Sequence, residues 1–381
     1  MTQPLNVLLM ASSIAMGGGE RNIISLLPNL KEKRVNVVLC TMNTRRDSPL
    51  AEVFSKTGIK RFDLAAKRMV DWSAWKKFTT ILRSQEINLI HAQDQDTIIY
   101  AGLASLIFGI PSVMTRHVMV EPVTSWKTAL RARMVFWSAR YGMDGVIAVS
   151  EKVRRQFAEQ AGIPLSKIET VYNGIELERF ERRRHRDELR ARLGWDLNRP
   201  IAILVSVLRA GKGFEMLFEA IPRIRAVFPE FQVKLAGGGE LEAELRQQAR
   251  SLGDAVEFLG QRMDIPDLLG ASDLLLQSSW TEALPTVLIE AGAASLPVVA
   301  TNVGGTAEIV EHGRSGYIVD PGDVDAMVKG VIRILESPSN AVEMGKFAHD
   351  FVVKTFTLPE QAGHTKAYYE RILSSKHENT L

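Results

Sequence analysis

The sequence predicts an α/β protein made of two similar domains, each a parallel β-sheet covered by helices. Its 381 residues exceed the usual size of one domain, which is about 100–200 residues. Hydrophobic residues make up 46% and charged residues 24%, the balance of a globular protein rather than a disordered one. Short apolar runs alternate with helical patterns, and the alternation restarts after a charge-dense segment, which indicates two doubly wound sheets.

The first half holds six apolar, β-branched runs that predict strands at 6–11, 35–41, 89–91, 112–115, 145–149 and 167–171. Helical patterns fall between them, near 20–31, 74–85, 97–108, 127–141 and 151–161. The alternation then breaks at 178–192, which lacks an apolar stripe long enough to bury. We therefore expect a first domain over 1–180 and a partly helical linker over 181–192.

The second half repeats the pattern, with strands predicted at 201–207, 232–236, 255–259, 274–277, 298–300 and 316–319. Helices are predicted near 213–226, 240–251, 264–270, 286–295 and 323–336. A second domain is expected over 193–357. The remaining tail is helical, and we expect 358–381 to return to the first domain. Two such domains with a linker predict a ligand cleft between them.

Composition narrows the classes of protein further. No apolar run approaches the ~20 residues of a membrane-spanning helix. The N-terminus lacks a basic region, apolar core and cleavage site in order, and Cys40 is the only cysteine. A disulfide within the chain and a cysteine-rich metal site are excluded, and a reducing cytoplasmic location is expected.

The net charge of +3 is unevenly distributed. Residues 1–180 carry +8, 181–192 carry +3 and 193–381 carry −8. Because no nucleic-acid recognition motif accompanies the basic half, we expect no nucleic-acid partner. An anionic membrane surface or an acidic acceptor fits the charge equally well.

Three loops after predicted strands have residues suited to a phosphorylated ligand, since ligands of open parallel sheets lie beyond the carboxyl ends of the strands. Three glycines, Gly17, Gly18 and Gly19, precede a helix whose N-terminus would offer N–H groups to an anion. A tight turn is the alternative. The dinucleotide spacing of glycines fails here because residue 22 is Asn, which argues against a nicotinamide oxidoreductase.

The second loop, 207–214, carries Arg209 and Lys212 beside glycines, a pair of cations suited to a diphosphate. A solvated basic turn is its alternative. In the third segment, Glu282 and Glu290 stand eight positions apart around Pro285, a residue favourable at a helix start. Carboxylates held there suit a hydroxyl-rich ligand such as a sugar or a ribose, whereas a capping acid and an exposed acid are the alternative.

These residues resemble a family. The pair of glutamates is similar to the Glu-x7-Glu motif of retaining glycosyltransferases of family 4, and 17–21 resembles the family's Gly-Gly-x-Glu-Arg loop. Further similar stretches extend the resemblance over roughly 1–335, at 145–150, 172–180, 235–240, 297–308 and 313–322.

The resemblance implies the GT-B fold, with two Rossmann-like domains that face a central cleft and a C-terminal helix that returns to the first. It implies sugar transfer from a nucleotide sugar, such as a UDP-, GDP- or ADP-sugar, to a glycan or lipid-linked acceptor. Transfer would proceed with retention, and no metal or other cofactor would be required. The resemblance implies a role in polysaccharide or glycolipid synthesis. If the protein is peripheral to the membrane, it would act on the inner face.

The resemblance also implies roles for single residues. Glu282 would contact the donor sugar, Glu290 the ribose and Lys212 the diphosphate, with Gly18 and Gly19 approaching phosphate and sugar. Leu284, Pro285 and Thr286 would complete the donor site, and His117 would lie near the reacting centre. Two positions depart from the family pattern: Val207 occupies the usual arginine position, so Arg209 must substitute, and Ala283 replaces a glycine.

Two alternatives stay open. A sugar-nucleotide epimerase or hydrolase would share the two-domain plan, and a non-catalytic sugar-binding protein would share the pockets. Helix 126–141 has an apolar stripe at Trp126, Leu130, Met134, Trp137 and Tyr141, flanked by basic residues. The pattern favours packing of this stripe on the protein's own sheet. The other interpretation is an interfacial helix that docks on anionic lipid.

Overall fold

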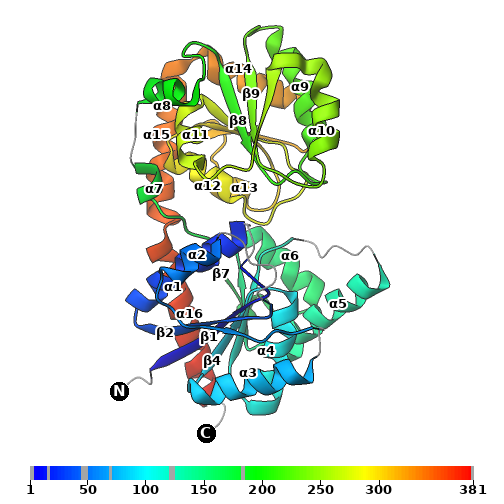
Figure 1. The fold of residues 1–381 in the computed structure, drawn as a ribbon, viewed down its shortest axis with the longest axis vertical. Coiled ribbons are helices and arrows are strands. Elements are labelled where there is room, and N and C mark those ends of the chain that lie inside the picture. Colours follow the sequence, from blue (N-terminus) through cyan, green and yellow to red (C-terminus); the bar gives the residue numbers. More distant parts are fainter. Residues whose placement is uncertain are drawn as a thin grey trace. The chain divides into compact units, whose positions relative to one another are not determined.

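The computed structural model describes residues 4–14, 18–43, 50–67, 71–119, 125–181 and 185–378. The chain forms two compact units (Figure 1), one of Met1–Ile175 with Leu358–Leu381 and one of Glu176–Thr357. Each unit is a parallel sheet with helices on both faces, which confirms the predicted α/β class. The segment predicted as a linker, 181–192, therefore belongs to the second unit.

The first unit contains a parallel sheet of order β3-β2-β1-β4-β5-β6-β7. Its strands are β1 (Leu5–Ala11), β2 (Val35–Thr41), β3 (Arg61–Asp63), β4 (Leu89–Ala92), β5 (Ser112–Arg116), β6 (Gly145–Ala148) and β7 (Ile168–Thr170). Its helices are α1 (Gly18–Glu32), α2 (Leu50–Ser55), α3 (Trp72–Ser84), α4 (Gln95–Phe108), α5 (Trp126–Trp137), η2 (Ser138–Gly142), α6 (Glu151–Ala161), η3 (Leu165–Lys167) and α16 (Leu358–Glu378). The central strands are apolar on both faces because helices cover both, and Cys40 of β2 lies in this core, where burial raises its pKa to about 12.

The second unit contains a parallel sheet of order β10-β9-β8-β11-β12-β13. Its strands are β8 (Ile201–Val205), β9 (Gln232–Ala236), β10 (Val256–Gly260), β11 (Leu274–Gln277), β12 (Val298–Thr301) and β13 (Gly316–Val319). Its helices are α7 (Glu178–Glu181), α8 (Arg186–Leu193), α9 (Phe214–Arg225), α10 (Glu242–Gln248), η4 (Ala249–Ala255), α11 (Ile265–Ala271), α12 (Thr286–Ala293), α13 (Thr306–Ile309), α14 (Val324–Glu336) and α15 (Pro338–Thr355). Strand β8 pairs with β9 on one side and with β11 on the other.

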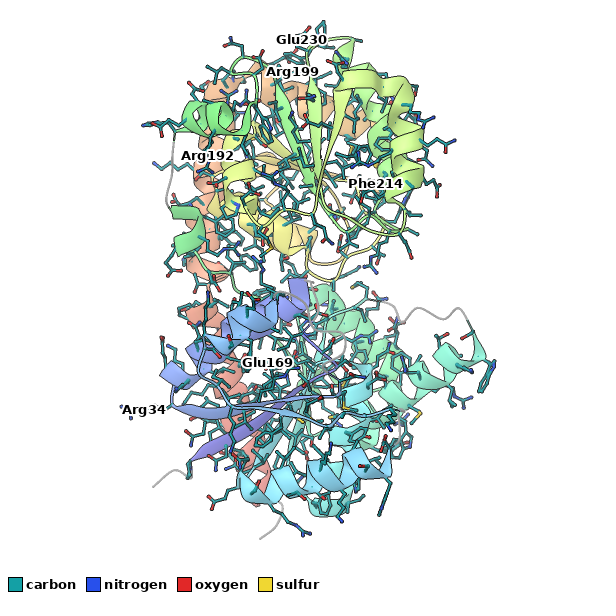
Figure 2. All side chains as sticks on the ribbon, viewed as in Figure 1. Arg34, Glu169, Arg192, Arg199, Phe214 and Glu230 are labelled. Carbon is teal, nitrogen blue, oxygen red and sulfur yellow. The ribbon has the colours of Figure 1, made fainter. Side chains whose placement is uncertain are left out.

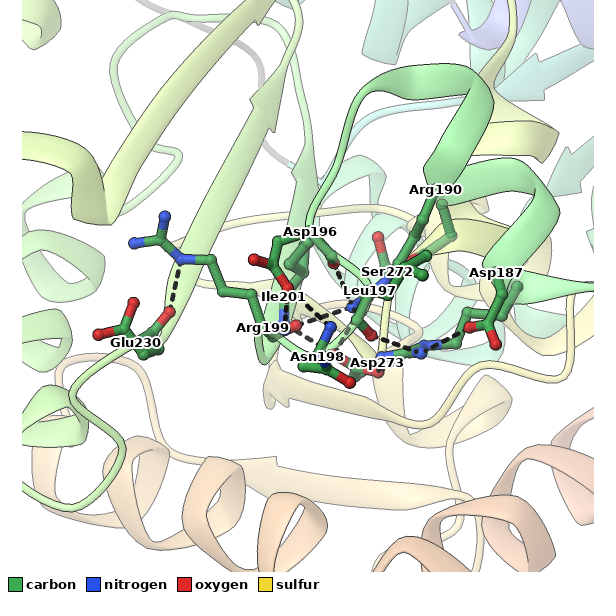
Figure 3. A network of polar contacts seen from close by, with 12 residues as sticks. Asp187, Arg190, Asp196, Leu197, Asn198, Arg199, Ile201, Glu230, Ser272 and Asp273 are labelled. Carbon is green, nitrogen blue, oxygen red and sulfur yellow. Dashed lines mark hydrogen bonds and ion pairs between the residues drawn. The ribbon is translucent and has the colours of Figure 1, made fainter.

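Helix α8 explains why 186–192 is not a free linker. The side chain of Arg190 is fully buried and donates to the carbonyl oxygens of Ala271 (2.8 Å) and Arg199 (2.8 Å) and to Asp273 Oδ2 (2.8 Å) (Figure 3). It also donates to the carbonyl of Leu197 at 3.1 Å. One cation thus fixes α8 to two other segments of the unit, 197–199 and 271–273, a role that an apolar stripe usually fills.

The last helix, α16, packs in the first unit, as the family resemblance implied. The amide of Gln361 bonds the side chain of Asn22 in α1 in both directions, at 2.9 and 3.0 Å, and Gln361 Oε1 also accepts from Gly174 N–H at 2.8 Å. Tyr369 Oη lies 2.5 Å from His91 Nδ1 at the end of β4. The C-terminal segment is therefore part of the first unit's core.

The apolar stripe on α5 and η2 does not pack on the protein's own sheet, as the sequence pattern had favoured. Trp126, Leu130, Trp137 and Tyr141 are all exposed, by 49% or more. The helix packs instead through small residues on its other side, which include Ala132, Val135 and Ala139. The preference for core packing of this stripe was wrong, because large apolar residues were assumed to mark the buried side.

Candidate active site

The second unit has a switch point where ligands of parallel sheets bind. The chain leaves β8 toward β9 on one side, and later returns to β11 on the other side of β8. The loops that follow β8 and β11 therefore diverge at their carboxyl ends and leave a crevice. These loops are 206–213 and 278–285, and they contain Arg209, Lys212 and Glu282 of the residues predicted to bind the donor.

Lys212 and Glu282 meet at this crevice. Lys212 Nζ donates to Glu282 Oε1 at 2.7 Å, and the Ser279 hydroxyl donates to the same oxygen, also at 2.7 Å. The side chains of the pair are only 14% and 18% exposed. Residues 70 positions apart in the chain thus form one half-buried polar cluster, open enough for a ligand to reach and too buried for water to screen fully.

The two loops can approach because glycines replace side chains at the contact. A Cβ on Gly213, at a φ of +67°, would lie 1.9 Å from the carbonyl oxygen of Ser278. A Cβ on Gly304, at a φ of +52°, would lie 1.9 Å from the carbonyl oxygen of Glu282. A larger residue at Gly213 would therefore push the two loops apart, and one at Gly304, in the loop after β12, would displace the backbone of Glu282.

Two helices begin at the same edge. Helix α9 starts after Gly213, anchored by the buried ring of Phe214 (Figure 2), and α12 starts after Pro285. Neither Gly213 nor Pro285 has a side-chain oxygen to cap the first N–H groups of its helix. These groups and the positive end of each helix suit an anion such as a phosphate.

The other residues predicted to bind the donor lie on the same loop as Lys212 or on the segment that follows Glu282, and they differ in how exposed they are. Arg209 is on the same loop as Lys212, but its side chain is exposed. Leu284 and Pro285 are buried, whereas Thr286 and Glu290 of α12 are half-buried. Their roles toward a donor stay predictions.

The first unit has its own cavity of about 250 Å³ at the carboxyl ends of β1, β4 and β5. Gly19, Glu20, Asp94, Arg116 and His117 are among its lining residues. Gly18 begins α1, while Gly17 lies outside the described residues. The cavity sits at the switch point of this sheet, between β1 and β4, as the topology requires.

His117 is held by a neighbour that the sequence did not single out. Its Nε2 lies 2.7 Å from Gln93 Oε1, an atom that only accepts, so Nε2 carries the proton and Nδ1 keeps its lone pair. Gln93 Nε2 in turn lies 3.2 Å from His91 Nε2. Burial, with a smaller effect of Arg116, lowers the pKa of His117 to about 4, so the ring is neutral at pH 7.

The carboxylates of this cavity differ in role. Asp94 caps α4 and accepts from the Ser12 hydroxyl at 2.7 Å, so its carboxylate marks a helix start. Burial raises the pKa of Asp94. Burial also raises the pKa of Glu20, and the charge of Asp94 adds to the rise. Glu20 is thereby suited to exchange a proton or to bind a hydroxyl.

Sequence reasoning missed Gln93 and Ser279. Each follows the end of a strand, β4 or β11, by one or two positions. The same strand-end rule that selected Lys212 would have selected them. Among the described residues, no three His, Cys, Asp or Glu side chains gather to hold a metal ion. In that same part of the chain, no helix is both long and apolar enough to cross a bilayer.

Models of known protein families match both units. The family model of Glycosyltransferase Family 4 matches residues 16–179, and that of Glycosyl transferases group 1 matches residues 185–351. N-acetyl-alpha-D-glucosaminyl L-malate synthase of Bacillus anthracis is 30% identical over 239 residues, 61% of this chain and 62% of that protein.

Two further similarities come from Mycobacterium and Anabaena. A GDP-mannose-dependent alpha-(1-6)-phosphatidylinositol monomannoside mannosyltransferase of Mycobacterium tuberculosis is 32% identical over 60% of this chain and 62% of that protein. Both matched relatives are thus covered over less than two thirds of their length. The crystal structure of Anabaena Alr3699/HepE in complex with UDP-glucose superposes with a TM-score of 0.83 at 25% identity, over 96% of this chain and 100% of that one. Because the two family models together account for both units, this chain belongs to the GT-B glycosyltransferases of family 4 and group 1.

Proposed function

We propose that this protein transfers a sugar from a nucleotide-sugar donor to a glycan or lipid-linked acceptor, with retention at the anomeric carbon and without a bound metal ion. The second unit binds the donor and the first unit binds the acceptor. One observation carries the proposal: Lys212 and Glu282 lie 2.7 Å apart at the switch point of the second sheet.

Lys212 serves the leaving group. As the bond from sugar to diphosphate breaks, negative charge grows on the diphosphate and positive charge on the sugar ring. An ammonium group already held in place stabilises the former, and one such preorganised donor is typically worth ~3–4 kcal/mol. The uncapped N–H groups at the start of α12 add to this field. Arg209 becomes a second cation when its exposed side chain turns to the phosphates.

Glu282 serves the sugar. Its carboxylate accepts hydrogen bonds, and Ser279 holds its Oε1 in place while the donor is absent. When the diphosphate binds Lys212, the ion pair breaks, and the Glu282 carboxylate can then accept hydrogen bonds from the sugar hydroxyls. Glu290 is assigned to the ribose, further along α12. Donor binding therefore exchanges an internal ion pair for two ligand contacts.

The first-unit cavity serves the acceptor. Its neutral His117 presents the Nδ1 lone pair, which can orient a hydroxyl or take its proton. Gly19 allows a ligand to approach the start of α1, since a Cβ there would meet no atom within 4 Å.

The names of the relatives support this class of substrates. The mycobacterial protein is described as GDP-mannose-dependent and as acting on a phosphatidylinositol mannoside, and the Anabaena structure holds UDP-glucose. We assign the chain to cell-surface polysaccharide or glycolipid synthesis in the cytoplasm, where the single thiol of Cys40 stays reduced.

The test is a thermal-shift screen with UDP-, GDP- and ADP-sugars, followed by turnover with the sugar that binds. A ligand at 100 times its Kd adds ~2.7 kcal/mol of stability. The shift should be markedly smaller in the Lys212→Ala variant, and NMR of the product should show the donor's anomeric configuration. Donor breakdown at full rate without any acceptor would instead indicate a hydrolase or epimerase.

A further inference from the structure

We propose that α5 and η2 form a surface that docks on an anionic lipid membrane. We call this surface the aromatic–basic stripe. Its members are the exposed side chains of one helical face and the cations beside them: Trp126, Lys127, Leu130, Arg133, Trp137, Arg140 and Tyr141. The inference goes beyond the transferase reaction and does not depend on it.

The large apolar side chains of the stripe lie on one face and outside the core. The intervals between Trp126, Leu130, Trp137 and Tyr141 are four, seven and four positions, which place them in line along a helix. They are 73%, 49%, 49% and 57% exposed. Helix α5 stands at the outer edge of the first unit (Figure 1), so the stripe faces solvent. Large apolar groups gathered in this way usually mark an interaction site.

The charge around the stripe selects an anionic partner. Residues 125–143 contain four cations and no Asp or Glu. Among the described residues, Arg131 is the one cation of this segment that pairs with a carboxylate, Asp96 of α4 at 3.1 Å, and it lies at the margin of the stripe. Lys127 lies 5.7 Å from the Trp126 ring centre and Arg140 lies 5.4 Å from that of Tyr141. Cations are thereby held beside the rings that would enter the interface.

The kinds of residue favour lipid over a protein partner. Tryptophan and tyrosine prefer the level of the lipid headgroups, and lysine and arginine extend from there to the phosphates. This combination on one helix face is the pattern of helices that lie in the membrane surface. The helix is formed before docking, because Ser125 and Thr128 make a capping box at its start. Docking therefore requires no folding step.

The experiment is sedimentation with vesicles of phosphatidylcholine, alone or with 30 mol% phosphatidylglycerol, at low and at 0.5 M salt. The test variant carries Lys127→Glu, Arg133→Glu and Arg140→Glu. The matched control carries Lys31→Glu, Lys33→Glu and Lys76→Glu, which are exposed lysines of the same unit and give the same change of net charge. A third variant, Trp126→Ser with Trp137→Ser, removes the rings and keeps the charges.

We expect the wild type to bind the anionic vesicles at low salt and to release them at high salt. Binding should fall by about fivefold for each stripe cation removed, and the control triple variant should bind much more tightly than the stripe variant. The tryptophan variant should lose binding and the blue shift of fluorescence that accompanies it. Absence of binding by the wild type, or equal losses in the two triple variants, would overturn the proposal. So would a dimer in light scattering that the tryptophan variant dissociates, since the stripe would then cover a second copy.

Discussion

Removal of Lys212 and removal of Glu282 should have different effects on the binding of a free nucleoside diphosphate. The two side chains share a 2.7 Å ion pair with less than a fifth of either exposed, so the diphosphate competes with Glu282 for Lys212. A hydrogen bond to a charged group contributes ~1.5–3 kcal/mol, and 1.4 kcal/mol is tenfold. Lys212→Ala should therefore weaken diphosphate binding by roughly 10- to 150-fold.

Glu282→Gln should leave diphosphate affinity unchanged or raise it, because a negative competitor is gone. Turnover should still fall by about 10²–10³-fold, as expected for loss of a preorganised contact to the reacting sugar. Calorimetry gives the affinities and initial rates give turnover. Arg246→Ala, which breaks the exposed pair with Glu242, is the control and should change neither. If Glu282→Gln weakened diphosphate binding as much as Lys212→Ala, the assignment of Glu282 to the sugar would be refuted.

Four further outcomes are expected. Gly19→Ala should fold normally, because its Cβ meets no atom within 4 Å, yet lower turnover by filling ligand space; an unchanged rate would place the ligand elsewhere. The pKa of His117 is lowered from 6.5 to about 4, so its contribution to stability is complete above pH 6.5 and is lost as pH falls toward 4. His117→Asn should flatten that part of the pH dependence of the melting temperature, and an identical slope would contradict the lowered pKa. Arg190→Ala should destabilise the second unit by ~3–5 kcal/mol, since the carbonyl oxygens of Ala271 and Arg199 lose this buried donor and Asp273 loses one of its two arginines. Arg186→Ala, whose side chain is 38% exposed, should cost at most ~1 kcal/mol; equal costs in urea unfolding would show that burial does not decide the effect. Dialysis against EDTA should leave turnover intact, and loss that Mg²⁺ restores would show a required metal.

Much of the fold could be predicted because its strands are buried on both faces. The predicted bounds of 35–41, 232–236 and 274–277 coincide with β2, β9 and β11. Strand β3 and helix α2 were missed, since three and six residues are too few to establish a period. The predictions were thus most accurate where a long apolar run permits one structure only.

The pairing of site residues was harder to predict than their identity. Lys212 and Glu282 were each selected from their place after a strand, yet their contact depends on the adjacency of β8 and β11. Arg190 was assigned to a partly helical linker, because its acceptors are backbone carbonyls of two other segments, 196–199 and the end of α11. A sequence pattern shows which side chains are present, but it does not show which backbone carbonyl oxygens will surround a guanidinium in the folded chain.

In the proposed function, Lys212 leaves its ion pair with Glu282 to bind the diphosphate of the donor. The most direct measurement is a crystal structure of the protein soaked with UDP and, separately, with GDP. We expect diphosphate oxygens within hydrogen-bonding distance of Lys212 Nζ, at the start of α12, with the 2.7 Å contact to Glu282 broken or lengthened. A diphosphate bound only in the first-unit cavity, with that contact intact, would contradict it.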